Sequence, residues 1–334
     1  MNKEFIFKRV AFSSATLILI ILVSIFVMLF ISAKPAIKEY GWHFLIDSSW
    51  NKTIEIKSDK PVVANKTTTK ATLDDSDSDD GSLFADDDSP ILDQSSDDSE
   101  VSQNTITKTI YGGFVPILGT ILSTLVAMAF AMPIAMGIAI FLSEIAPKFL
   151  IKPVGLAIEL LAAIPSIIYG MWGLFYFAPI VQKIFGGSQI SLLTAGLVLG
   201  VMILPFMAAI TRDAMNTTPD VLKESAYALG ATKFEVVKDV IFPYAKVGIF
   251  GSVILSLGRA LGETMAVAFL IGSVFKVPHS LTDPTTSIPV VLANNFGEAS
   301  GEMMSALFYL AFILFVFSFF VIGIAKFYFL RNHR

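Results

Sequence analysis

Hydrophobic residues gather along this chain in six long runs that polar segments separate. These runs cover residues 10–33, 113–142, 153–181, 190–211, 248–273 and 303–325. Each run reaches the length of about 20 residues that an α-helix needs to cross the hydrocarbon core of a bilayer. Because lipid offers the backbone no hydrogen-bond partners, uncharged runs of this length must be helical. The pattern therefore predicts an all-α, polytopic membrane protein with about six transmembrane helices.

The composition agrees with a membrane protein and narrows its chemistry. Hydrophobic residues make up 54% of the 334 residues and charged residues only 16%, with a mean hydropathy of +0.70. Cysteine is absent, which excludes disulfides, thiolate catalysis and cysteine metal sites. His43, His279 and His333 lie far apart in the sequence, so we predict no metal site and no catalytic residues.

The first hydrophobic run is predicted to stay on the mature protein as an anchor. Residues 10–32 carry no charge, and Lys34 and Pro35 follow them. A signal peptide has a shorter apolar stretch, of about 7–15 residues, and ends in small residues at a cleavage site. The length of the run and the residues after it favour a transmembrane helix.

The distribution of basic residues predicts the orientation. Lysines and arginines gather in residues 3–9, 148–152, 212–246 and 326–334, whereas the short loops between these segments hold only Lys183 and Lys276. Cytoplasmic loops are enriched in basic residues. We therefore expect both termini in the cytoplasm.

The same spans divide the chain into three parts. Residues 1–33 form the cytoplasmic N-terminus and first anchor, residues 34–110 a polar extracytoplasmic loop, and residues 111–330 a core of five transmembrane helices. Within the polar loop, residues 73–100 are rich in aspartate and contain no base. Such a block repels itself and cannot bury a core, so it is predicted to be disordered. Its spacing lacks the glycine that a calcium-binding turn needs, so a solvated segment is favoured.

The cytoplasmic segment 212–247 carries signals for two short helices. Thr218 is placed to cap the first helix, and Gly230 is placed to end it. Thr232 and Glu235 have the spacing of a capping box that begins the second helix. Pro243 is expected to end that helix. The prediction is a rigid pair of helices that projects from the membrane.

The spacing of Glu224, Ala226, Gly230 and Pro243 resembles the EAA loop of ABC importer permeases. This resemblance implies the type I ABC importer permease fold. It also implies that the loop is a coupling helix, which docks on an ATPase subunit. The chain lacks the G-x-x-x-x-G-K-[ST] pattern that cradles phosphates in P-loop ATPases. We therefore expect no cofactor in this chain, with ATP and Mg bound by the partner ATPase, and a transporter subunit that is not an enzyme.

Three further stretches narrow the resemblance to one family. The segments 111–127, 158–180 and 258–272 closely resemble the PstC permease subunits of phosphate-specific ABC importers. The resemblance implies phosphate as cargo, a PstA-like second permease, two PstB-like ATPase subunits and a PstS-like extracytoplasmic phosphate-binding protein. It also implies a location in the plasma (inner) membrane of a bacterium, and no nucleic acid as a partner. The acidic insertion is not part of the family pattern.

Arg259 is the one basic residue among 24 that the predicted spans leave inside the membrane. An arginine near a helix centre costs about 2.5–3.5 kcal/mol to insert, and such residues usually face a bundle interior or an aqueous path. Its planar fork of donors matches phosphate oxygens. Glu263 lies four residues later, hence on the same face of a continuous helix.

The interpretation of this pair leaves an alternative open. Arg259 and Glu263 are predicted to line the phosphate translocation path, and the family resemblance implies that both matter for transport. The alternative is a buried ion pair that aligns two helices. Glu159 is predicted to lie at a helix interface, and Arg212 and Asp213 to form an interfacial pair.

Two other functions remain open from the sequence. A permease for another oxyanion, such as molybdate or sulfate, would need the same coupling loop. A membrane component that senses phosphate could use the same scaffold. A secondary transporter is disfavoured, because it would need no capped coupling loop and no inverted repeat is evident.

Overall fold

The computed structural model describes residues 2–57 and 105–331, which belong to two compact units. The first unit comprises Met1–Asn51 and Tyr111–Arg334, and the second comprises Lys52–Ile110. The acidic block 73–100 lies outside the described residues, and its disorder stays a prediction.

The described part of the second unit is a two-stranded antiparallel ribbon. Strand β1 (Lys52–Lys57) pairs with β2 (Thr105–Ile110), with Lys52 opposite Ile110 and Lys57 opposite Thr105. Both strands are rich in isoleucine and threonine, whose branched side chains suit a pleated surface. The sequence predicts only a polar loop here, so the ribbon is an addition to the all-α prediction.

The first unit confirms the prediction of six helices long and apolar enough to span a membrane. Two of them are the terminal helices, α1 (Asn2–Tyr40) and α12 (Gly301–Arg331). A short 3-10 turn, η1 (Gly41–Leu45), follows α1. The other four spans are built from the elements α2 (Phe114–Ile140) with η2 (Phe141–Ile145), α4 (Ser166–Trp172) with η3 (Gly173–Phe177) and α5 (Ala178–Phe185), α6 (Leu192–Asn216), and α8 (Lys233–Glu235) with η4 (Val236–Ile241) and α9 (Phe242–Leu261).

The third predicted span, 153–181, is not one helix. It is divided at Pro165 into α3 (Lys148–Ala163) and α4, because Ile164 and Pro165 adopt extended backbone angles. A proline disfavours helical geometry at the residue before it and cannot donate a backbone hydrogen bond. The helical segment that is long enough to cross the membrane is therefore Ser166–Phe185.

The fifth predicted span, 248–273, is displaced toward the N-terminus. The helix runs from Lys233 to Leu261, so Pro243 does not end the second short helix as expected. Pro243 lies in the first turn of α9, directly after the π-helical segment η4. A missing N–H is tolerated where the hydrogen-bond pattern changes register. The coupling segment therefore continues without a break into a transmembrane helix.

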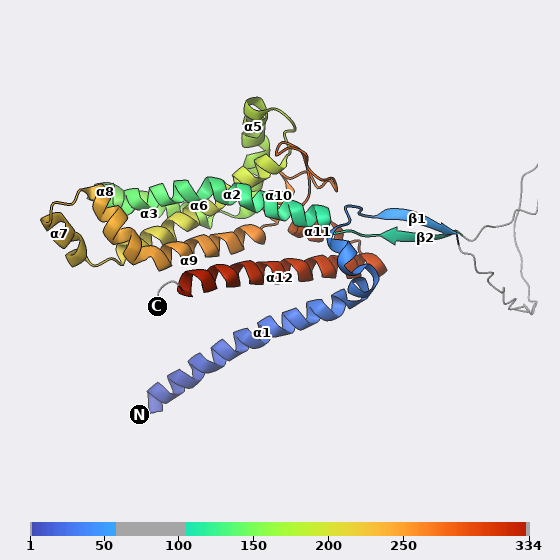
Figure 1. Cartoon of the computed structure of the whole chain (residues 1–334), viewed down its shortest axis with the longest axis horizontal. Helices are drawn as coiled ribbons and strands as arrows, with labels where there is room; N and C mark the ends of the chain where they lie inside the picture. Colours follow the sequence, from blue (N-terminus) through green and yellow to red (C-terminus); the bar gives the residue numbers. More distant parts are fainter. Residues whose placement is uncertain (1, 58–104, 332–334) are drawn as a thin grey trace, which may run out of the picture. The chain divides into compact units, whose positions relative to one another are not determined.

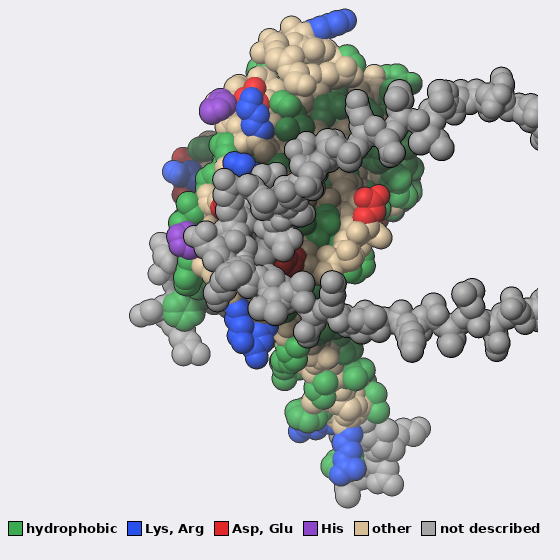
Figure 2. All heavy atoms as spheres, turned by 90° about the vertical axis from the view of Figure 1, so that its right-hand side faces the viewer, with side chains coloured by type: hydrophobic (Ala, Val, Ile, Leu, Met, Phe, Trp, Pro, Cys, Tyr) green, Lys and Arg blue, Asp and Glu red, His purple; other side chains and the backbone are tan. Residues whose placement is uncertain are grey.

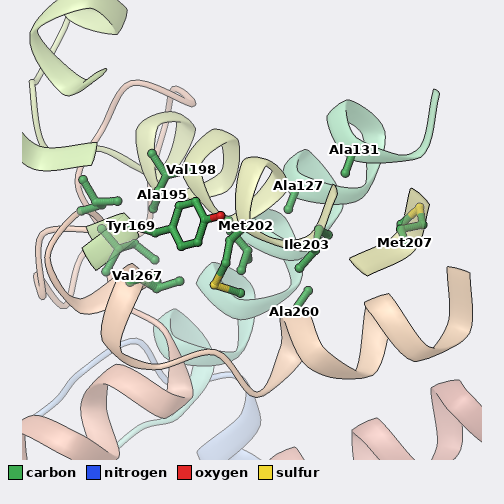
Figure 3. Packing of buried hydrophobic residues seen from close by; sticks show 14 of the residues in the cluster. Ala127, Ala131, Tyr169, Ala195, Val198, Met202, Ile203, Met207, Ala260 and Val267 are labelled. Carbon is green, nitrogen blue, oxygen red and sulfur yellow. The ribbon is translucent and has the colours of Figure 1, made fainter. Parts of the chain in front are cut away.

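Helix α6 is the most buried of the six spans and lies beside α2, α3 and α9 (Figure 1). Two glycines of α6 let α2 approach closely. A Cβ on Gly196 would lie 2.7 Å from the Val126 side chain, and one on Gly200 would lie 3.1 Å from the Ala127 carbonyl oxygen. Small residues play this role in membrane helix contacts generally. Figure 3 shows the resulting core, in which Ile203 of α6 lies between Ala127 of α2 and Ala260 of α9.

Helix α1 packs on α12 through aromatic side chains. Phe26 lies 5.4 Å from Phe312 and 5.9 Å from Phe315, measured between ring centroids, and Phe30 lies 5.6 Å from Phe312. The large apolar residues of α1 from Phe7 to Ile25 are exposed, and the visible surface of α1 in Figure 2 is largely hydrophobic. A helix that is apolar all round suits lipid, which supports the prediction of a membrane anchor.

Two short helices complete the first unit between the last two spans. They are α10 (Met265–Ala268) and α11 (Ile288–Asn295). The Thr120 hydroxyl of α2 accepts a hydrogen bond of 2.9 Å from the Ile288 N–H at the start of α11. This contact fixes α11 against α2 close to the end of α9.

Candidate functional site

Arg259 lies in the last turn of α9 and is partly buried inside the helix bundle. Its guanidinium carbon is 5.5 Å from the centroid of the Phe206 ring of α6, in a cation–π contact. Tyr169 of α4 is within electrostatic range of the same charge. Ala260, the next residue, is buried against α6 (Figure 3). The arginine is thus held at the meeting point of three helices.

Glu263 is not on the helix that carries Arg259, which corrects the expectation of a shared helix face. Helix α9 ends at Leu261 with Gly262 as its C-cap, and Glu263 belongs to the link between α9 and α10. Its Oε1 atom accepts a hydrogen bond of 3.4 Å from the Ala266 N–H. Glycine is the weakest helix former after proline, which explains why the helix stops here.

Among the described side chains, the Arg259 guanidinium faces an aromatic ring rather than a carboxylate. Across the side chains that the structure describes, no ion pair joins its guanidinium to an acidic residue. The last carbonyl groups of a helix lack partners and carry a partial negative charge that favours a cation in the last turn. The guanidinium therefore keeps donors available for an anionic ligand.

The four residues of the predicted coupling loop belong to a helix–turn–helix. Glu224 and Ala226 lie on α7 (Asp220–Ala228), Gly230 follows that helix, and Pro243 lies on α9. Glu224 and Pro243 are exposed, whereas Ala226 is partly buried. The structure places the four residues along one continuous segment and does not bring them into a single cluster.

Gly230 ends α7 as predicted. Its φ of +87° is in the left-handed region that glycine adopts without strain. The Gly230 N–H donates to the Tyr227 carbonyl at 2.9 Å, and the Ala231 N–H donates to the Ala226 carbonyl at 3.1 Å. These two bonds form a Schellman motif, which satisfies carbonyl groups that the helix end leaves free.

The capping box is also confirmed. The Thr232 N–H donates to Glu235 Oε2 at 2.7 Å, and the Glu235 N–H donates to Thr232 Oγ1 at 3.4 Å. Thr218, in contrast, does not cap α7. The N-cap residue is Pro219, and the Thr218 hydroxyl is buried with no hydrogen-bond partner among the described residues. The bonds at Gly230 and the capping box at Thr232 therefore hold both ends of the turn between α7 and α8.

Replacing Thr232 with alanine is expected to loosen this turn. The variant removes the hydroxyl acceptor and weakens the reciprocal bond, so amide hydrogen exchange at residues 232–236 should become about fivefold faster. Exchange followed by mass spectrometry on the purified protein measures this. Thr217→Ala is the control, because the Thr217 hydroxyl only donates to the Ala214 carbonyl. Equal exchange in the two variants would contradict the assigned role of the box.

Arg212 forms the interfacial group that the sequence indicated. Its guanidinium contacts Asp213 Oδ1 at 2.8 Å and Glu159 Oε1 of α3 at 3.5 Å. The sequence did not predict a second ion pair. Lys223 Nζ of α7 contacts Glu144 Oε1 of η2 at 2.7 Å. These residues are 79 positions apart, and only the position of α7 against α2 brings them together.

The family of this chain is established by comparison with known proteins. Residues 110–331 match the family described as "Binding-protein-dependent transport system inner membrane component". The chain belongs to this family. It is therefore a multi-pass membrane protein and a subunit of an ABC importer, in which other subunits take part, and it is not an enzyme.

Among the relatives of this permease are two proteins named "Phosphate transport system permease protein PstC". The protein from Pasteurella multocida (strain Pm70) is 50% identical over 244 residues, which cover 67% of this chain and 76% of the relative. The protein from Haemophilus influenzae (strain ATCC 51907 / DSM 11121 / KW20 / Rd) is 39% identical over 343 aligned residues, covering 97% and 92% respectively.

A solved structure supports the fold of the permease. A chain from an inward-facing crystal form of the MetNI methionine ABC transporter has a TM-score of 0.54 at 20% sequence identity. The match covers 65% of this chain and 94% of that chain. Together with the family match, it confirms the predicted importer permease fold.

Proposed function

We propose that this permease forms part of an ATP-driven importer that moves inorganic phosphate into the cytoplasm. The observation that carries the proposal is Arg259, a guanidinium inside a transmembrane helix with no acidic partner among the described side chains. A charge in this position is costly unless it serves a path or a ligand. The names of the two PstC relatives support phosphate as the anion.

In this proposal Arg259 binds phosphate during transport, and Glu263 adjusts the strength of that binding. The guanidinium offers two parallel N–H donors, which suit the spacing of phosphate oxygens. Glu263 lies four residues away, on the link that follows α9. Its carboxylate lowers the net attraction for an anion there, which helps the cargo to leave, since a site that binds too tightly would trap it.

The exposed surface of the coupling segment 212–247 supports an ATPase partner. Val221, Leu229 and Phe234 are 70%, 90% and 73% exposed, which is unusual for large apolar residues at a polar membrane boundary. We propose that this surface docks on one of two PstB-like ATPases, which bind ATP and Mg. A PstA-like permease completes the channel, and a PstS-like protein delivers phosphate. Both termini and the segment 212–247 then lie in the cytoplasm, below the bacterial inner membrane.

Transport by the reconstituted complex tests the function. Proteoliposomes that contain the permease, its partner subunits and ATP should take up phosphate, and an excess of sulfate or molybdate should not compete. Competition by molybdate or sulfate at equal strength would favour the permease for another oxyanion. A complex that moves no anion but still alters phosphate signalling would favour the sensing function and contradict transport.

A further inference from the structure

The Lys223–Glu144 ion pair is largely shielded from water where α7 meets η2, at the end of α2. The two charged atoms are 2.7 Å apart, and the side chains are only 15% and 12% exposed. The Lys238–Asp239 pair, nearby in the sequence, is 3.9 Å apart and more than 60% exposed on both sides. An exposed pair contributes little, whereas breaking a buried pair leaves a charge that water cannot solvate. The first pair therefore holds its two elements together firmly.

Helix α7 packs beside η4, but it offers α2 few side-chain contacts other than the ion pair. Of its residues Asp220–Ala228, all are exposed except Lys223 and Ala226, which lie three positions apart on one face. Ala226 joins an apolar cluster that includes Ala139 of α2 and Met215 of α6. One methyl group buries little area. The ion pair is thus the main side-chain attachment of α7 to α2.

The position of the pair in the chain gives it a mechanical consequence. Helix α7 is joined covalently to α6 by residues 217–219 and to α8 by residues 229–232. It has no such junction with α2. Glu144 lies in η2, and the helical span Phe114–Ile145 is continuous. A displacement of α7 therefore reaches α6 and α9 through the backbone, but reaches α2 directly through the ion pair.

We propose that Lys223 and Glu144 are positioning residues that make α2 move together with α7 during transport. With the pair intact, α2, α6 and α9 follow a displacement of α7 as one body. Without it, the displacement of α7 reaches α2 only indirectly, through the packing of α2 on α6, so ATP is hydrolysed without a full change where α2 faces α6. This inference rests on the proposed function, because it assumes that an ATPase partner acts on α7.

The measurement is the number of phosphate ions moved per ATP hydrolysed, in proteoliposomes that hold the complete complex. Lys223→Met and Glu144→Gln should each lower this ratio at least about fivefold, the lower end of usual coupling between sites. The exchanged pair Lys223→Glu with Glu144→Lys should return the ratio to within about twofold of the wild-type value. Lys183→Met, at an exposed lysine of α5 outside the coupling segment 212–247, is the matched control and should keep the wild-type ratio.

The outcomes separate this inference from its alternatives. A pair that only stabilises the fold would lower the amount of assembled complex and leave the ratio unchanged, which overturns the proposal. If Lys223→Met does not assemble, Glu144→Gln decides, because it removes the charge while keeping an acceptor for the lysine. A wild-type complex that moves no phosphate contradicts the proposed function instead. Wild-type uptake with unchanged ratios in the single variants contradicts only the role of the pair.

Discussion

Arg259→Ala is expected to reduce phosphate uptake by about a hundredfold or more, while the complex still assembles. Two charge-assisted hydrogen bonds to an anion are lost, and a factor of 100 corresponds to about 2.7 kcal/mol. Alanine is a good helix former, and removal of a charge lowers the cost of inserting α9 into lipid. Assembly should therefore be preserved or improved even though transport fails.

Uptake per assembled complex is the quantity to compare among variants. Arg259→Lys should fall between wild type and alanine, because an ammonium group keeps the charge but loses the planar fork. Lys183→Ala, at an exposed lysine of α5 outside the bundle, should transport normally. If Arg259→Ala assembles and transports like wild type, Arg259 has no role toward the cargo. If it fails to assemble, the residue serves as a structural lock between helices.

The second large effect is expected at Gly119, where α2 meets the segment that precedes α11. A Cβ added to Gly119 would overlap the carbonyl oxygen of Thr286, which is a backbone atom and cannot rotate away. Overpacking of this kind usually costs about 1–3 kcal/mol. Gly119→Ala should therefore destabilise the protein by about 3 kcal/mol, and the neighbouring bond from Ile288 to Thr120 should weaken with it.

Gly137 of the same helix provides the control. A Cβ there meets nothing within 4 Å, so Gly137→Ala should be neutral or stabilise α2 by up to about 1 kcal/mol. The thermal unfolding midpoint of each purified variant measures the difference. Similar midpoints for the two alanine variants would show that the contact at Gly119 relaxes freely, contrary to the backbone clash described above.

The sequence predicts well those features that depend on neighbouring residues. The six spans follow from uninterrupted apolar runs, and the capping box and the left-handed glycine follow from residues within one or two turns of each other. The division of the third span had a visible local cause in Pro165. Membrane helices often tolerate an internal proline, so Pro165 alone does not determine whether this run stays one helix or divides.

The site itself depends on contacts that the sequence does not reveal. The periodicity of residues 248–273 suggests a continuous helix, whereas α9 ends at Leu261 and α10 packs on α4. Gly170 explains part of this packing, since a Cβ there would lie 3.0 Å from the Ala266 backbone. Glu144 and Lys223 are likewise paired by the fold. Patterns within a single sequence do not show which residues far apart in the chain come into contact.

The end of α9 at Leu261 has a geometric consequence for Arg259, which lies just before it, and Glu263, which lies just after it. An α-helix advances 1.5 Å and turns 100° per residue, so one added turn spans only about 5.4 Å. If residues 262–264 were wound into that turn, Glu263 would lie directly above Arg259 and within reach of its guanidinium. The present link keeps the carboxylate aside. Whether the Glu263 carboxylate can neutralise the Arg259 guanidinium thus depends on whether residues 262–264 are wound into a helical turn.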